Sequence, residues 1–204
     1  MVLLLLSTGG VVMGRSREFE ENVVLQKAME LFWQQGYEKT SLRELVEHMG
    51  IHRRSLYDTF GDKHTLFLKT IDFYGKIIKD RLTSEISRTE TAKQAIACIF
   101  DFTIEGSHDG PLGCFFVNTA TELAPCDKEI EVRMQKAFMQ TEQLLTDLIC
   151  KGQETGEFSS DYDAAVLAES LNTTLIGIRV LARTVTSKEK LQRIANFFLV
   201  ILNK

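Results

Sequence analysis

The sequence contains little proline, no closely spaced cysteine pairs and no strong excess of charge of either sign. Its 204 residues include two prolines and four cysteines, and the formal net charge is −4. Long amphipathic segments with few helix breakers, and without sustained alternation of apolar and polar positions, predict an all-α protein. Because no Cys-x-x-Cys pair occurs, the sequence favours reduced thiols over a disulfide framework or a metal site.

The slight negative charge and the N-terminal residues narrow the class of protein further. A net charge of −4 gives no overall electrostatic attraction to nucleic acid, so any DNA contact must come from a local patch. Residues 1–6 form an apolar run that is too short for a membrane span and lacks the basic start of a signal peptide. We therefore expect a soluble, cytoplasmic protein without a membrane partner, with residues 1–18 as a flexible leader in which Met13 is an alternative start.

The stretch from Thr40 to Phe60 predicts a helix-turn-helix. Ser41 and Glu44 have the spacing of a capping box, an apolar stripe follows them, and Gly50 supplies the left-handed residue that ends the first helix. A second short helix then runs from about Arg53 to Phe60 and turns its large apolar residues inward.

The outer face of this second helix carries the groups expected of a helix that reads DNA. They are Arg53, Arg54, Ser55, Tyr57 and Thr59. Guanidinium, phenol and hydroxyl groups bond phosphate oxygens and base edges in the major groove. An ordinary pair of helices with a solvated polar face is the alternative, because this geometry is not unique to DNA-binding proteins.

The remaining helical segments predict a small N-terminal domain joined to a larger one. A helix from Glu20 to Gln35 completes a three-helix DNA-binding unit, and a helix capped by Asp62 and ending near Ile86 connects the two parts. Further helices are expected at 91–106, 113–123, 127–152, 163–182 and 187–202. The predicted domains are residues 19–64 for DNA binding and 65–204 for ligand binding and dimerisation.

The last two predicted helices have apolar faces too wide for one core contact. Such an antiparallel pair can pack on its copy as a four-helix bundle, which predicts a homodimer through these helices. Burial of both helices within one chain is the alternative. A two-fold dimer would read two half-sites one helical turn apart.

Three segments resemble the N-terminal domain of the TetR family of transcriptional regulators. They read GYEKTS at 36–41, GI at 50–51 and SLYDTFGDK at 55–63, and the similarity covers about Glu20 to Leu68. Weaker motifs, GCFFVN at 113–118 and IRVLAR at 178–183, resemble the ligand domain of one subgroup. The resemblance implies an all-α dimer of about nine helices, whose small domain binds double-stranded DNA and whose large domain holds a ligand cavity.

The resemblance also implies roles for single residues. Tyr57 and Lys63 match positions that bond phosphates, and Thr40 matches a hydroxyl that fixes the entry of the helix after Ser41. The positions that vary and read bases are His52, Arg53, Arg54 and Ser55. At position 52 the family usually has Ser or Thr as a helix cap, so here the cap is expected to be weaker, or the imidazole reaches DNA.

The implied function is that of a ligand-responsive repressor on a palindromic operator. An unknown small molecule in the large domain would move the connecting helix and change the separation of the two recognition helices. The candidate ligand residues are Phe73, Phe100, Phe115, Asn118, Glu122, Met134 and Phe138. Plain core packing is the alternative for most of them, whereas Asn118 and Glu122 are polar groups four apart in a short apolar helix and need partners.

Three other functions fit less well. Cys114 with His108 could supply a thiol nucleophile and a base, but no orienting acid is evident, so we expect neither an enzyme nor a cofactor. Sensing of an oxidant or electrophile by Cys114 is an alternative to its burial as a small apolar residue. A DNA-binding structural or cell-division protein of the same fold, without promoter regulation, is the third.

Overall fold

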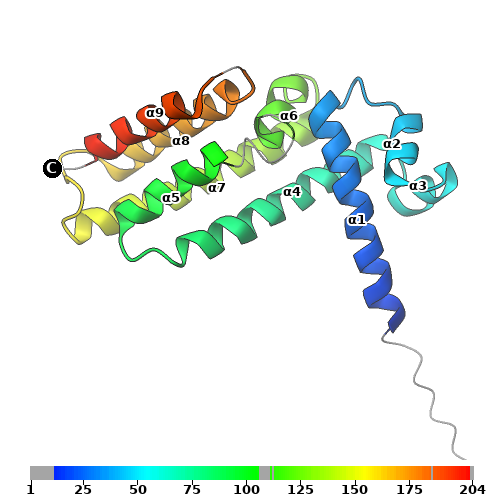
Figure 1. Ribbon diagram of the computed structural model, residues 1–204, viewed down its shortest axis with the longest axis horizontal. Coiled ribbons are helices and arrows are strands. Elements are labelled where there is room, and N and C mark those ends of the chain that lie inside the picture. Colours follow the sequence, from blue (N-terminus) through cyan, green and yellow to red (C-terminus); the bar gives the residue numbers. More distant parts are fainter. Residues whose placement is uncertain (1–11, 106–110, 112, 185, 203–204) are drawn as a thin grey trace, which may run out of the picture.

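A computed structural model describes residues 12–105, 111, 113–184 and 186–202, with side chains described from residue 21 onward. Within these residues every regular element is an α-helix, which confirms the predicted all-α fold (Figure 1). The helices are α1 (Val12–Gln35), α2 (Leu42–Met49), α3 (Arg53–Phe60), α4 (Lys63–Ile86), α5 (Ala92–Glu105), α6 (Phe115–Leu123), α7 (Lys128–Glu154), α8 (Ala164–Leu181) and α9 (Lys188–Ile201).

Side-chain caps fix the starts of most helices at the predicted residues. The hydroxyl of Ser41 accepts the backbone N–H of Glu44, and the Glu44 carboxylate accepts that of Ser41, so the capping box of α2 is complete. The carboxylates of Asp62 and Asp127 cap α4 and α7 by accepting backbone N–H groups of the first turn. His52 stands at the N-cap of α3 without a side-chain cap bond, in agreement with the expectation of a weaker cap.

Helix α1 begins earlier than the sequence predicts. It starts at Val12 rather than Glu20, so the later part of the predicted leader is helical, while residues 1–11 lie outside the described part of the chain. Residues 14–22 carry mostly charged and polar side chains. No apolar stripe marks this part of the helix, which is why the periodicity did not reveal it.

Two apolar clusters hold the helices together. The first contains buried residues of α1 to α4 and also of α6 and the first half of α7, for example Phe32, Leu56, Phe67, Phe115 and Met134. The second joins α5, the later part of α7, α8 and α9. Helix α4 runs from the helix-turn-helix along the bundle towards α5 (Figure 1). The first cluster therefore crosses the predicted boundary between residues 64 and 65.

Helix α8 is long and apolar enough, by length and composition alone, to span a membrane. Its buried residues include Leu171, Asn172 and Leu175, and it packs along α7 in the second cluster. These contacts make α8 a core helix of the second cluster.

Candidate DNA-binding surface and its junction with the helical bundle

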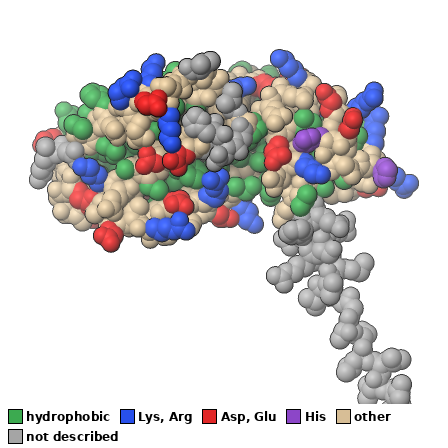
Figure 2. All heavy atoms as spheres, in the orientation of Figure 1, with side chains coloured by type: hydrophobic (Ala, Val, Ile, Leu, Met, Phe, Trp, Pro, Cys, Tyr) green, Lys and Arg blue, Asp and Glu red, His purple; other side chains and the backbone are tan. Residues whose placement is uncertain are grey.

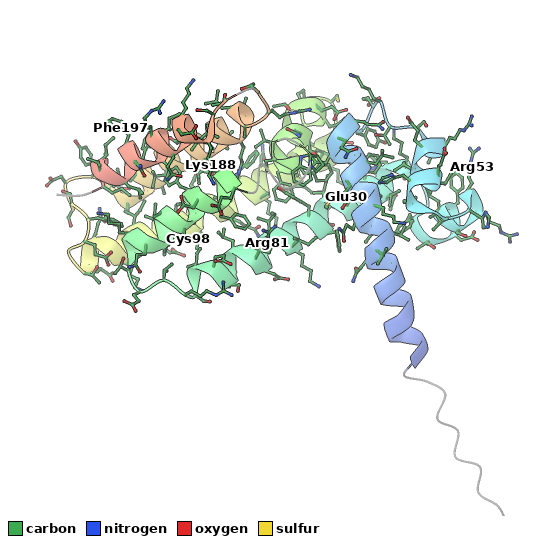
Figure 3. All side chains as sticks on the ribbon, viewed as in Figure 1. Glu30, Arg53, Arg81, Cys98, Lys188 and Phe197 are labelled. Atoms are coloured by element: carbon green, nitrogen blue, oxygen red, sulfur yellow. The ribbon has the colours of Figure 1, made fainter. Side chains whose placement is uncertain are left out.

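Helix α3 presents polar side chains to solvent because its large apolar residues are used in the core. Leu56 and Phe60 are buried in the first cluster. The five predicted DNA-contacting residues at the start and on the outer side of this helix are all exposed: His52, Arg53, Arg54, Ser55 and Tyr57. Figure 3 shows Arg53 at the outer end of the molecule, pointing away from the bundle.

The charged groups of α3 are held only by weak local contacts. The Arg53 guanidinium lies 5.7 Å from the centroid of the Tyr57 ring, and its Nη2 is 3.4 Å from the Tyr57 hydroxyl. Arg54 pairs with Asp58 at 3.6 Å, and the Arg54 side chain is 92% exposed. Exposed pairs of this kind contribute little to stability, so both guanidiniums are available to phosphates or base edges.

The other predicted DNA-binding residues lie around the helix-turn-helix and differ in their exposure and in their contacts. Lys63, at the first position of α4, is half-buried, and its Nζ lies 4.1 Å from the centroid of the Tyr37 ring. Thr40 is buried, and its hydroxyl donates to the backbone carbonyl of Gly36 at 2.6 Å. Ser41 is exposed, but its hydroxyl is already hydrogen-bonded in the capping box with Glu44. Thr40 and Ser41 thus shape the entry to α2.

Basic side chains gather at the end of the molecule formed by α2 and α3. Figure 2 shows Lys, Arg and His side chains on this end of the visible face. The exposed basic residues of these helices and their caps are Arg43, His48, His52, Arg53 and Arg54. The exposed acids Glu44, Glu47 and Asp58 lie on the same two helices, so contact with a polyanion depends on the direction of these basic side chains and not on a net positive charge.

A carboxylate from α6 ties the DNA-binding unit to the bundle. Glu122 accepts the backbone N–H groups of Tyr37 and Glu38 at 3.1 and 3.0 Å. A Cβ at Gly36 would lie 2.8 Å from both carboxylate oxygens, and Gly36 has φ +85°, so glycine is required there for two reasons. Glu122 was predicted as a ligand residue and not as a partner of this turn, although Gly36 is a signal of a close approach.

A histidine–carboxylate hydrogen bond and an ion pair join α4 to α7. His64 Nε2 lies 2.7 Å from Asp127 Oδ2, and Arg133 Nη1 donates to both oxygens of Asp72 at 2.8 and 2.9 Å. Burial raises the pKa of Asp127, but hydrogen bonds from the Ile130 backbone and from His64 outweigh it, so the pKa lies below its usual value. These pairs hold the start of the connecting helix against the bundle.

A cavity of about 330 Å³ lies between α1 and α6, next to the Glu122 contact. Of the seven predicted ligand residues, Phe115, Asn118 and Glu122 line it. Met134 is buried in the first apolar cluster, where Phe73 and Phe138 also pack, and Phe100 is buried in the second. The structure therefore does not bring the seven residues together.

The four cysteines are free thiols in separate places. Cys114 is buried, and its Sγ lies 3.6 Å from the hydroxyl of Tyr74, whose pKa is raised mainly by burial. Cys98 is half-buried, while Cys126 and Cys150 are exposed. No group of three possible metal ligands occurs among the described residues, and His108 lies outside them.

Helices α8 and α9 leave large apolar side chains in solvent. Phe197 and Val200 are 62% and 66% exposed, and Val166, Val180 and Ile201 are also exposed. Figure 3 shows Phe197 on the outer side of α9. Single exposed apolar residues are ordinary, but this group lies on two neighbouring helices and forms a candidate contact surface.

Both the N-terminal and the C-terminal part of the chain match known protein families. Residues 24–70 match the family described as "Bacterial regulatory proteins, tetR family", and residues 92–198 match "Tetracyclin repressor-like, C-terminal domain". The chain is 31% identical over 194 residues to the uncharacterized HTH-type transcriptional regulator YezE of Bacillus subtilis (strain 168), covering 94% of this chain and 100% of YezE.

Two further relatives carry the words repressor or operator in their descriptions. The HTH-type transcriptional repressor ComR of Escherichia coli (strain K12) is 34% identical over 185 residues, covering 89% of this chain and 88% of ComR. A cysteine mutant of the TetR family transcriptional regulator CifR, complexed with a 26-base-pair double-strand operator DNA, has a TM-score of 0.80 and 26% identity. That similarity covers 89% of this chain and 95% of CifR.

Proposed function

Because this chain belongs to the TetR family of transcriptional regulators, we propose that it is a repressor that binds a palindromic operator as a homodimer and leaves it when a small-molecule effector binds. It is a sequence-specific DNA-binding regulator with a helix-turn-helix.

The exposed outer side of α3 is the observation that carries this proposal. Its two guanidiniums and its phenol make only weak contacts within the protein and lie in the segment that matches the tetR family. We assign base reading to His52, Arg53, Arg54 and Ser55, and phosphate contacts to Tyr57 and Lys63. The CifR mutant of similar fold is described in complex with operator DNA, which supports operator binding by a chain of this fold.

The homodimer accounts for the exposed apolar residues of α8 and α9. A two-fold axis through these helices would bury Phe197 and Val200 of both copies and would place two copies of α3 for two half-sites. An effector that prefers one arrangement of the dimer shifts operator occupancy, and a coupling of roughly 1 to 3 kcal/mol already changes affinity several-fold or more. We place the protein in the cytoplasm, where its DNA target is.

The rival functions have less support. A DNA-binding structural or cell-division role is not favoured, because the relatives reported above are described as transcriptional regulators or repressors. We propose no enzymatic role: Cys114 is buried against Tyr74, and no described residue provides it with a base.

Titration of the purified protein against its own upstream intergenic DNA tests the proposal. Fluorescence anisotropy at near-physiological salt, with excess random DNA as competitor, is expected to show tight, competitor-resistant binding with two or four chains per site. The double variant Arg53→Ala/Arg54→Ala should lose this specific binding, whereas Lys93→Ala on α5 should keep it. Wild-type binding that random DNA removes would contradict repression at this promoter.

A further inference from the structure

From the cavity between α1 and α6, we infer that the effector is a small aromatic carboxylate that binds there by displacing Glu122 from the backbone N–H groups of Tyr37 and Glu38. The inference rests on the proposed function, because it names the site and the chemical class of the effector. It differs from the sequence expectation of a cavity deep in the large domain, since the walls come from both parts of the molecule.

The cavity has the size and the apolar wall of a ligand site. Its volume of about 330 Å³ falls in the range of small-molecule pockets. Phe32, Trp33 and Phe67 from the DNA-binding side and Phe115 from α6 supply the apolar wall. Phe32, Phe67 and Phe115 are each 1% exposed and pack edge-to-face on one another, so they form the closed floor of the cavity. The half-buried Trp33 is the ring that a planar aromatic guest can contact.

Hydrogen-bond donors in and beside the cavity suit a carboxylate. The N–H groups of Tyr37 and Glu38 already hold one, that of Glu122, at 3.1 and 3.0 Å. Trp33 also lines the cavity, and its buried Nε1 has no hydrogen-bond partner among the described residues. Because this atom is closed to solvent, a guest oxygen reaches it only when the cavity wall shifts, so the two backbone N–H groups are the donors that select a carboxylate.

The charges on the wall also favour an anion. Lys39 and Arg183 line the cavity, and neither takes part in an ion pair within the described part of the chain. The Arg183 side chain lies against Gly113, where a Cβ would be 2.7 Å from its Cγ, so it is held close to the start of α6. Glu38 is the other acid on the wall, but it is exposed and can turn to water.

Competition for the two N–H groups would couple the site to DNA binding. Glu122 belongs to α6, whereas Tyr37 and Glu38 belong to the turn that leads into α2. A guest carboxylate that takes these bonds frees the turn from α6. The DNA-binding unit then loses one of the contacts that set its position on the bundle, and the equilibrium shifts towards arrangements with lower operator affinity.

The single tryptophan of the chain allows a direct test, because Trp33 lies in the cavity wall. The full-length protein is titrated with phenylbutanoate and with its neutral isostere phenylbutanamide, reading Trp33 fluorescence in one experiment and operator anisotropy in another. We expect saturable binding of the acid, about tenfold weaker binding of the amide, and release of the operator by the acid alone.

Three variants separate competition from a purely structural role of Glu122. Glu122→Gln should bind phenylbutanoate at least about threefold more tightly, because it removes an anionic competitor from the two N–H groups. Arg183→Gln should bind it about tenfold more weakly. Arg81→Gln is the control: Arg81 of α4 (Figure 3) stacks on Phe102 of α5, outside the cavity. This variant should bind phenylbutanoate as the wild type does.

The two experiments tell apart the failure of this inference and the failure of the proposed function. An unchanged Trp33 signal with phenylbutanoate, equal binding of the amide, or weaker binding by Glu122→Gln would overturn the carboxylate site even if the operator is bound. Absence of operator binding by the ligand-free protein, with the Trp33 titration as expected, would overturn the repressor function and leave the site standing.

Discussion

Gly36 is the single residue on which the contact between α1 and α6 depends most directly. Its φ of +85° places it in the left-handed region, and the Glu122 carboxylate occupies the space where a side chain would be. Thr40 fixes the same turn from the other side, since its buried hydroxyl donates to the Gly36 carbonyl. A short turn thus carries both a local and a long-range contact.

The variants Gly36→Ala and Gly156→Ala together separate the contact with Glu122 from backbone strain at positive φ. For Gly36→Ala we expect a loss of about 1 to 3 kcal/mol in the free energy of unfolding, because alanine is strained at this φ and its methyl group would push Glu122 away. Gly156→Ala is the matched control, since Gly156 has φ +76° and nothing within 4 Å of a Cβ. Urea denaturation measures both, and equal losses would contradict the role of the carboxylate.

Lys63 and Arg54 are expected to differ in how they contribute to DNA binding. Lys63→Ala should weaken binding to all sequences and lower the magnitude of the negative slope of log affinity against log salt concentration by about 1, because one counterion fewer is released. Arg54→Ala should instead relax the preference at one base position, at a cost of roughly 1 to 3 kcal/mol. Anisotropy titrations over a salt series, on operator and random DNA, measure both effects. An unchanged slope for Lys63→Ala would contradict its phosphate contact. Equal loss of binding to operator and random DNA for Arg54→Ala would make Arg54 a contact of the DNA backbone.

At the scale of whole helices, α8 and α9 combine a buried and an exposed apolar side. Leu171, Leu175 and Leu191 pack within the chain, so the alternative of burial in one chain is correct for part of each helix. Phe197 and Val200 remain in solvent on the other side. Such a two-sided helix pair is what a dimer through these helices requires.

Phe197→Asp tests the dimer. The carboxylate would be buried against the second copy without a partner, so the dimer dissociation constant should rise at least about tenfold, as measured by sedimentation equilibrium. Met139→Asp on α7 is the control, because Met139 is 67% exposed and lies on neither α8 nor α9. Dissociation by Met139→Asp but not by Phe197→Asp would move the interface to α7.

Over the whole molecule, the order of helices could be predicted from sequence because their ends carry local signals. Ser41, Asp62 and Asp127 are caps that a reader finds within a few residues of each helix start. The grouping of the ligand candidates could not be predicted. Phe100 and Phe115 both lie in apolar helical segments, and their local sequence does not show which cluster each one joins. Only the packing of distant helices puts them in separate clusters.

Glu122 shows the same limit for the candidate site. Its spacing from Asn118 predicted both residues on one side of α6, and both line the cavity. Its partners, however, are backbone N–H groups 85 and 84 residues away in sequence, and no side-chain pattern marks such donors. Backbone partners of a distant carboxylate are set by tertiary packing alone.

Stability of the whole fold should depend on pH through the pair of Asp127 and His64. The pKa of Asp127 in the folded protein lies below its usual value of 3.8, so the unfolded chain takes up the proton first. The contribution of Asp127 is therefore present above the usual value and is lost as the pH falls through the folded pKa. Burial opposes this lowering, while bonds from Ile130 and His64 cause it.

Asp127→Asn should therefore make the free energy of unfolding fall less steeply below about pH 4, as followed by urea denaturation over a pH series. Asp163→Asn is the matched control, because Asp163 caps α8 through two backbone N–H groups and has no histidine partner in the described residues. A wild-type acid slope in Asp127→Asn would contradict the assignment.

One apolar cluster holds helices α1, α2, α3 and α4 against α6 and the first half of α7. This cluster limits where the chain can be divided for protein engineering. A chimaera cut between residues 64 and 65 would leave Leu45, Leu56 and Phe32 without the partners that α4 and α6 provide. Grafting its operator specificity onto another sensor therefore requires the exchange of the outer side of α3 alone, with the interior and the Gly36 turn of the recipient kept intact.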